Sequence, residues 1–75
     1  MIPQAGLDYL NLHLREARAA SDEVMAERLL TGAEGMVNYA LVCGQAEPRE
    51  HIAWVAMIAL VRAERTEKTL GRLIP

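Results

Sequence analysis

The sequence has no phenylalanine, and its only aromatic residues are two tyrosines and one tryptophan. Strand-favouring residues are therefore scarce apart from local clusters of Ile and Val, which argues against a β protein. The longest apolar run, residues 52–61, is too short to cross a bilayer, because a membrane helix needs about 20 apolar residues. We therefore expect no membrane association.

Cysteine is almost absent too, since Cys43 is the only one. A single cysteine cannot form an internal disulfide, whereas a small secreted domain normally carries an even set. The first residues, MIPQAGLDYL, lack the basic segment and the apolar run of a signal peptide. These absences predict a cytoplasmic location.

Chemistry-bearing motifs are lacking as well. His13 and His51 are far apart and have no further ligands at metal-binding spacing. Cys43 has no base near it in sequence that would activate it as a nucleophile. The stretch TGAEG, residues 31–35, lacks the Gly-Lys-Ser/Thr ending of a phosphate loop. We therefore expect no catalytic residues, no metal site, no cofactor and no enzymatic activity.

The composition that is present fits a small folded domain. The 75 residues suffice for one domain, and a chain so short buries only about 60% of its unfolded surface. Hydrophobic residues make up 52% of the chain and the net charge is only −2, so the composition does not predict disorder. The pI of about 5.6 argues against nucleic-acid binding, which normally requires a basic surface.

Boundary residues divide the chain into three predicted helices, over residues 4–20, 22–43 and 48–70. Proline suits the first turn of a helix, serine the capping position before it, and glycine the position after its last turn. The residues that mark the boundaries are Pro3, Ser21, Gly44, Pro48 and Gly71. Because the loop over residues 45–47 is short, the second and third helices are expected to form an antiparallel αα-hairpin. The predicted fold class is all-α, with the hairpin completed by dimerisation.

The first two helices have apolar faces of different widths. The first carries its apolar residues on one narrow face, consisting of Leu7, Leu10, Leu14 and Ala17. On the second, apolar residues cover most of the circumference, so we expect it to contact two neighbours. That placement puts Cys43 on a buried flank. Glycine inside a helix costs about 1 kcal/mol relative to alanine, so we expect Gly32 to lie in a close helix–helix contact.

The third helix has two apolar faces, and one chain has difficulty covering both. An alanine-rich face consists of Ile52, Val55, Ala56, Ala59, Ala63 and Leu70. Because small residues let helices approach closely, we assign this face to the chain's own core. The opposite Trp54 patch consists of Trp54, Met57, Ile58 and Val61, with the charge of Arg65 at its rim. Large apolar residues with a charged rim are typical of an interface, although the first helix is an alternative cover for this patch.

These patterns predict a non-catalytic protein–protein interaction module. We expect a homodimeric adaptor, inhibitor or regulator that binds itself and another protein through the Trp54 patch. One alternative is a small DNA-associated regulator, with the basic end of the third helix on phosphate through Arg62, Arg65, Lys68 and Arg72. Another is a helical ligand-binding bundle with its pocket between the second and third helices, near Tyr39 and Trp54.

Overall fold

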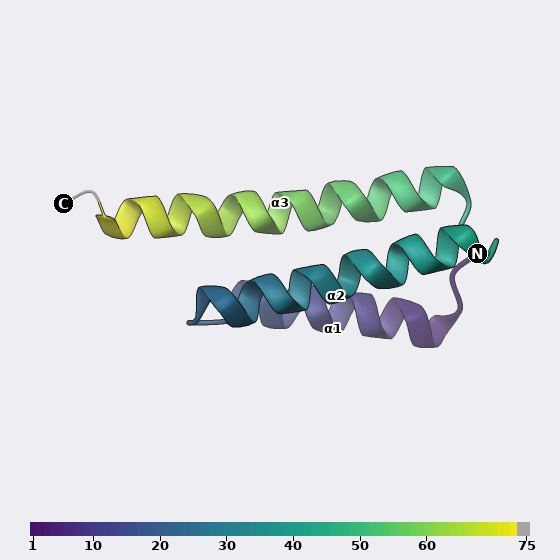
Figure 1. Ribbon diagram of the computed structural model, residues 1–75, viewed down its shortest axis with the longest axis horizontal. Coiled ribbons are helices and arrows are strands. Elements are labelled where there is room, and N and C mark those ends of the chain that lie inside the picture. Colours follow the sequence, from purple (N-terminus) through teal and green to yellow (C-terminus); the bar gives the residue numbers. More distant parts are fainter. Residues whose placement is uncertain (74–75) are drawn as a thin grey trace.

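Three helices make up the computed structural model, which describes residues 1–73. They are α1 (Gln4–Ala19), α2 (Glu23–Val42) and α3 (Pro48–Leu73), and no strand occurs within these residues. Successive helices run in opposite directions, so that α3 returns alongside α2 while α1 lies against both (Figure 1). The prediction of a three-helix, all-α fold is confirmed.

The junction between α1 and α2 differs by one residue from the prediction. The Asp22 side chain, rather than that of Ser21, accepts a hydrogen bond from the Val24 backbone N–H at 2.9 Å. Asp22 is therefore the N-cap residue of α2, and an aspartate oxygen satisfies one of the free amides of the first turn. Serine and aspartate are equally good caps, which is why the sequence does not distinguish these neighbours.

Gly44 ends α2 as predicted. Its φ of 74° lies in the left-handed region, which glycine adopts without steric cost. The Gly44 N–H donates to the Leu41 carbonyl at 3.1 Å, and the Gln45 N–H donates to the Ala40 carbonyl at 2.8 Å. This pair of bonds is a Schellman motif, and it reverses the chain so that α3 begins beside the end of α2.

α3 begins at Pro48 as predicted but ends later than predicted. The Glu50 carboxylate accepts hydrogen bonds from the backbone N–H groups of Glu47 and Ile2, at 3.2 and 3.4 Å. It thereby caps α3 and fastens the buried Ile2 against it. At the other end the helix passes through Gly71 to Leu73, so the prediction that Gly71 stops it is wrong. Glycine weakens a helix without prohibiting it.

The core lies between all three helices. The predicted face of α1 is confirmed, with Leu10, Leu14 and Ala17 buried and Leu7 packed against them. From α2 the core receives Ala26, Leu30, Ala33, Val37 and Ala40. Cys43 is exposed, so its predicted burial is wrong. The buried stripe of α2 is narrower than the apolar arc in its sequence, and Cys43 lies outside that stripe.

The prediction of which face of α3 enters the core is also wrong. Ile58 and Val61 are 1% and 0% exposed, whereas Ile52 of the alanine-rich face is 67% exposed. Hydrophobic stabilisation scales with the apolar area buried, so burying Ile58, Val61 and part of Trp54 stabilises the chain more than burying a row of alanines. Most of the alanine-rich face therefore points away from α1 and α2, while Val55 and Ala59 border the groove between α3 and α2.

The molecule is much longer than it is broad. Its extents are 47 × 19 × 14 Å, and α3 projects past the other helices at its C-terminal end (Figure 1). The accessible surface is 5096 Å². That is about a tenth more than the roughly 4,600 Å² expected for a compact monomer of 8.3 kDa. This modest excess agrees with the elongated shape of the molecule.

Candidate protein-binding surface

The Trp54 patch faces the inside of the molecule. Ile58 and Val61 are fully buried, and Trp54 is half-buried against the core. Met57 is 40% exposed at the edge, where the Arg18 guanidinium lies 3.8 Å from its sulfur. The patch is therefore covered by α1 and α2 of the same chain, which was the alternative considered for it. Ile58, Val61 and Arg65 do not offer a free surface to a partner.

Arg65 lies inside the molecule, not at the rim of an interface. Its side chain is only 5% exposed and makes a bidentate ion pair with Glu23, with the shorter bond at 2.7 Å. It also donates to the Ala17 carbonyl at 2.9 Å and to the Arg18 carbonyl at 3.4 Å. The hydrogen bond from Arg65 lowers the pKa of Glu23. One guanidinium group thus connects the end of α1, the start of α2 and the middle of α3.

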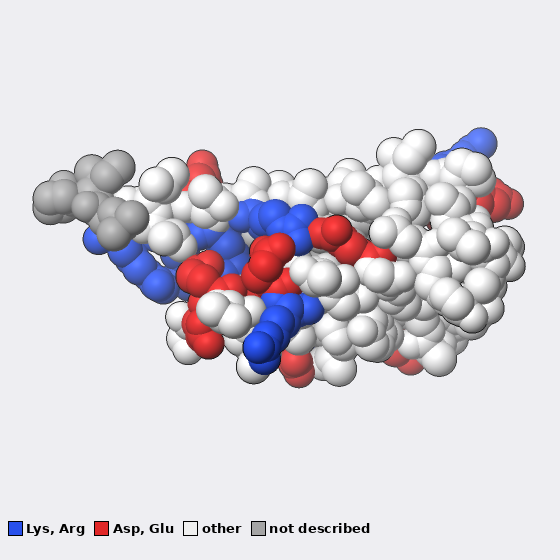
Figure 2. Space-filling model, viewed as in Figure 1, with Lys and Arg blue, Asp and Glu red and all other residues white. Residues whose placement is uncertain are grey.

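Much of the predicted basic end of α3 is neutralised within the chain. Arg62 donates to Glu27 at 2.8 Å and also pairs with Glu34, and the hydrogen bond to Glu27 raises its pKa. Figure 2 shows these charges gathered along the groove where α2 and α3 meet. Two of the four basic residues that were candidates for phosphate contact therefore already have carboxylate partners. This arrangement does not favour the DNA-associated alternative.

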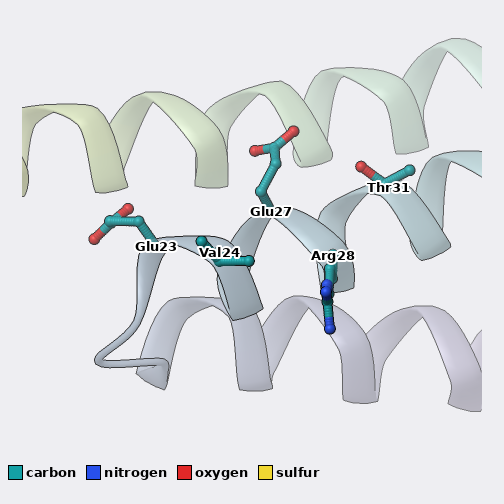
Figure 3. A pocket seen from close by; sticks show the side chains of 5 residues that line it. All are labelled: Glu23, Val24, Glu27, Arg28 and Thr31. Atoms are coloured by element: carbon teal, nitrogen blue, oxygen red, sulfur yellow. The ribbon is translucent and has the colours of Figure 1, made fainter.

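Two shallow hollows lie along α2. One is lined by Glu23, Val24, Glu27, Arg28 and Thr31, all from α2, and these side chains point in different directions (Figure 3). The other lies between α2 and α3, where the His51 ring nitrogen is 2.8 Å from the Asn38 side-chain oxygen. This second hollow lies between the two helices named for the ligand pocket, but neither Tyr39 nor Trp54 lines it. Within residues 1–73, no group of three potential ligands could hold a metal ion.

The alanine-rich face of α3 is the uncovered apolar surface with the clearest boundaries. Ile52 is 67% exposed, Val55 is 40% exposed, and Leu60, which borders the face, is 50% exposed. Ala56, Ala59 and Ala63 are exposed between them. No residue from Ile52 to Val61 carries a charge, and Arg49 and Glu67 flank the face along the helix. The spacing of these residues in the sequence defines this face, but the prediction that it lies in the core is wrong.

Comparison with protein-family models, with curated proteins and with solved structures found no match. Among the described residues, no helix is long and apolar enough to span a bilayer.

Proposed function

We propose that this protein is a non-catalytic interaction module that acts by binding another polypeptide chain through the alanine-rich face of α3. The observation that supports this proposal is the exposure of Ile52, at 67%, within a helix segment that carries no charge. Contiguous exposed apolar surface with polar surroundings is characteristic of protein-binding sites. The proposed contact surface is thus the face opposite the Trp54 patch.

The expected ligand is a helix. The three alanines of the face have short side chains, which let a second helix approach to the lower part of the usual range of about 8–10 Å between axes. Ile52 and Leu60 stand beside them as larger apolar contacts. A row of small residues between larger ones forms a groove along the helix, which suits the ridge of side chains on another helix.

The test compares two substitutions at residues of similar exposure. Ile52 is 67% exposed on the alanine-rich face, and Val24 is 61% exposed on α2. The immobilised protein is incubated with an extract of its source cells and, separately, with soluble copies of itself. Ile52→Glu should lose the chains that the wild type retains, because an unpaired carboxylate is costly to bury in a contact. Val24→Glu should retain them. Equal retention by Ile52→Glu and the wild type would contradict the proposal.

A further inference from the structure

We infer that the chain covering the alanine-rich face is a second copy of this protein, with the two α3 helices packed antiparallel about a two-fold axis that crosses α3 at the level of Ile58, on the side opposite that buried side chain. This inference rests on the proposed function, because it names the occupant of the same face. A two-fold contact uses the same surface on both copies, so that surface must be complementary to itself. Both the charges and the side-chain sizes along α3 meet this condition.

The charges that flank the face are opposite in sign and symmetrically placed. Arg49 and Glu67 are exposed, and neither makes an ion pair within residues 1–73. Steps of three, four or seven residues return to the same side of a helix. Such steps join Arg49 to Glu67 through residues 56, 60 and 63, so both charges lie on the side of α3 that carries the alanine-rich face. The midpoint between Arg49 and Glu67 in the sequence is Ile58. The midpoint of Ile52 and Ala63 falls between Met57 and Ile58, within one residue of it.

Antiparallel packing about this midpoint brings unlike charges together at both ends. Arg49 then lies beside the partner's Glu67, and Glu67 lies beside the partner's Arg49. Parallel packing would place Arg49 beside the partner's Arg49 and Glu67 beside the partner's Glu67. Like charges facing each other across an interface disfavour that arrangement. The charge pattern therefore selects one orientation of a second copy.

The side-chain sizes agree with a register within one residue of this one. About the midpoint between Met57 and Ile58, Ile52 faces the partner's Ala63 and Ala56 faces the partner's Ala59. Ile52 thus meets an alanine, and the centre of the contact is formed by alanines from both copies. Such an alternation of large and small side chains lets two helices interdigitate closely.

Other charged residues near the face already have partners within their own chain. Arg62 pairs with Glu27 and Glu34, and Glu64 accepts from Arg18 at 3.3 Å. A second α3 helix can therefore approach without leaving these side chains unpaired. The contact would run from Arg49 to Glu67, about 27 Å at 1.5 Å per residue. One helix pair of this length belongs to the smallest class of interfaces, below about 1,200 Å² in total, so the dimer should dissociate on dilution.

Light scattering and sedimentation over a dilution series test the inference. At high concentration the wild type should have twice the 8.3 kDa chain mass, and on dilution its mass should fall to that of a single chain. Arg49→Glu and Glu67→Arg should each weaken the dimer by roughly tenfold. The double variant Arg49→Glu/Glu67→Arg should restore it, because the unlike pairs are re-formed with reversed signs. A double variant as weak as the singles would overturn the inference.

Cross-linking in a Cys43→Ser background tests the orientation. Proteins carrying Ile52→Cys and Ala63→Cys should join to each other on mixing, faster than either joins to itself. In an antiparallel dimer of Ala63→Cys chains, the two introduced cysteines would lie about 16 Å apart along the helix axis, too far for a disulfide. Preferential self-linking of Ala63→Cys would overturn the antiparallel arrangement.

The outcomes also separate this inference from the proposed function. A wild type that stays monomeric at all concentrations overturns the inference. If that monomer still retains another protein, and Ile52→Glu releases it, the proposed function stands with a different occupant. If the wild type dimerises but Ala56→Glu and Ile52→Glu leave the dimer unchanged, the contact lies elsewhere and the inference fails. Circular dichroism confirms that each variant is folded.

Discussion

At the residue scale, the Arg65 side chain of α3 binds both other helices. It is 5% exposed, and its guanidinium satisfies two carbonyls at the end of α1 while pairing with Glu23 at the start of α2. The last carbonyls of a helix have no partners within the helix and need outside donors. Arginine fits this position because its planar fork supplies several donors at fixed angles, which lysine does not.

Arg65→Ala should therefore destabilise the fold. The change leaves buried carbonyls without a hydrogen-bond donor. It also removes the ion-pair partner of Glu23, but water can solvate that half-exposed carboxylate, so this second loss costs less stability. We expect about 2–3 kcal/mol lower stability by urea unfolding. Arg28→Ala is the control, because Arg28 is exposed and makes no ion pair within residues 1–73. A change at Arg65 no larger than at Arg28 would show that solvent replaces the lost bonds.

The two glycines in the middle of α2 provide a second matched pair. A Cβ atom on Gly32 would lie 3.1 Å from the Tyr9 hydroxyl and 3.4 Å from His13, whereas Gly35 has open space around it. Gly32→Leu should destabilise the protein by about 1–3 kcal/mol through overpacking. Gly35→Leu should stabilise it by up to about 1 kcal/mol, because leucine has the better helix propensity. Thermal unfolding measures both, and stabilisation by Gly32→Leu as well would mean that α1 moves to accommodate the larger side chain.

At the element scale, boundary signals located the helices to within a few residues. Pro48 and Gly44 are clear signals, because a fixed φ suits the first turn and a left-handed residue ends a helix. The ends marked by weaker signals were misplaced, at Ser21 by one residue and at Gly71 by three. Ser21 competes with an equally good neighbouring cap. Glycine alone does not end a helix, and α3 would end at Gly71 only if the chain turned there.

The C-terminal end of α3 should be the least protected part of the helix. Its last turns project past α1 and α2 (Figure 1), and isolated helical turns are marginal in water. Hydrogen exchange should show fast exchange of the amides from Leu70 onward and slow exchange around Val61, where opening requires loss of the core. Equal protection along α3 would indicate that another chain covers its end.

At the scale of the whole molecule, the sequence was sufficient for the fold class but not for the orientation of α3. Its periodicity defined two apolar faces correctly, yet a wheel diagram does not say which one turns inward. That choice depends on the combined volume that α1 and α2 leave to be filled. Ile58 and Val61 fill it better than the alanines do, at 1% and 0% exposure. The Trp54 patch, predicted as the interaction surface, is therefore largely buried in the chain's own core.

The orientation of α3 predicts opposite outcomes for a glutamate on its two faces. Val61→Glu buries an unpaired carboxylate among Leu14, Leu30 and the rest of the core, at a cost of several kcal/mol. A chain of this size has a stability of only about 4–11 kcal/mol at 0.05–0.15 kcal/mol per residue. Val61→Glu should therefore largely unfold it, seen as loss of the helical circular dichroism signal.

Ile52→Glu places the same carboxylate in solvent, because Ile52 is 67% exposed. The variant should keep its helical signal and differ from the wild type only in association. The two spectra together form the test, since each variant is the control for the other. A folded Val61→Glu with an unfolded Ile52→Glu would mean that α3 is turned by half a revolution from the orientation described. The alanine-rich face would then be core, and the Trp54 patch would again be the surface open to a partner.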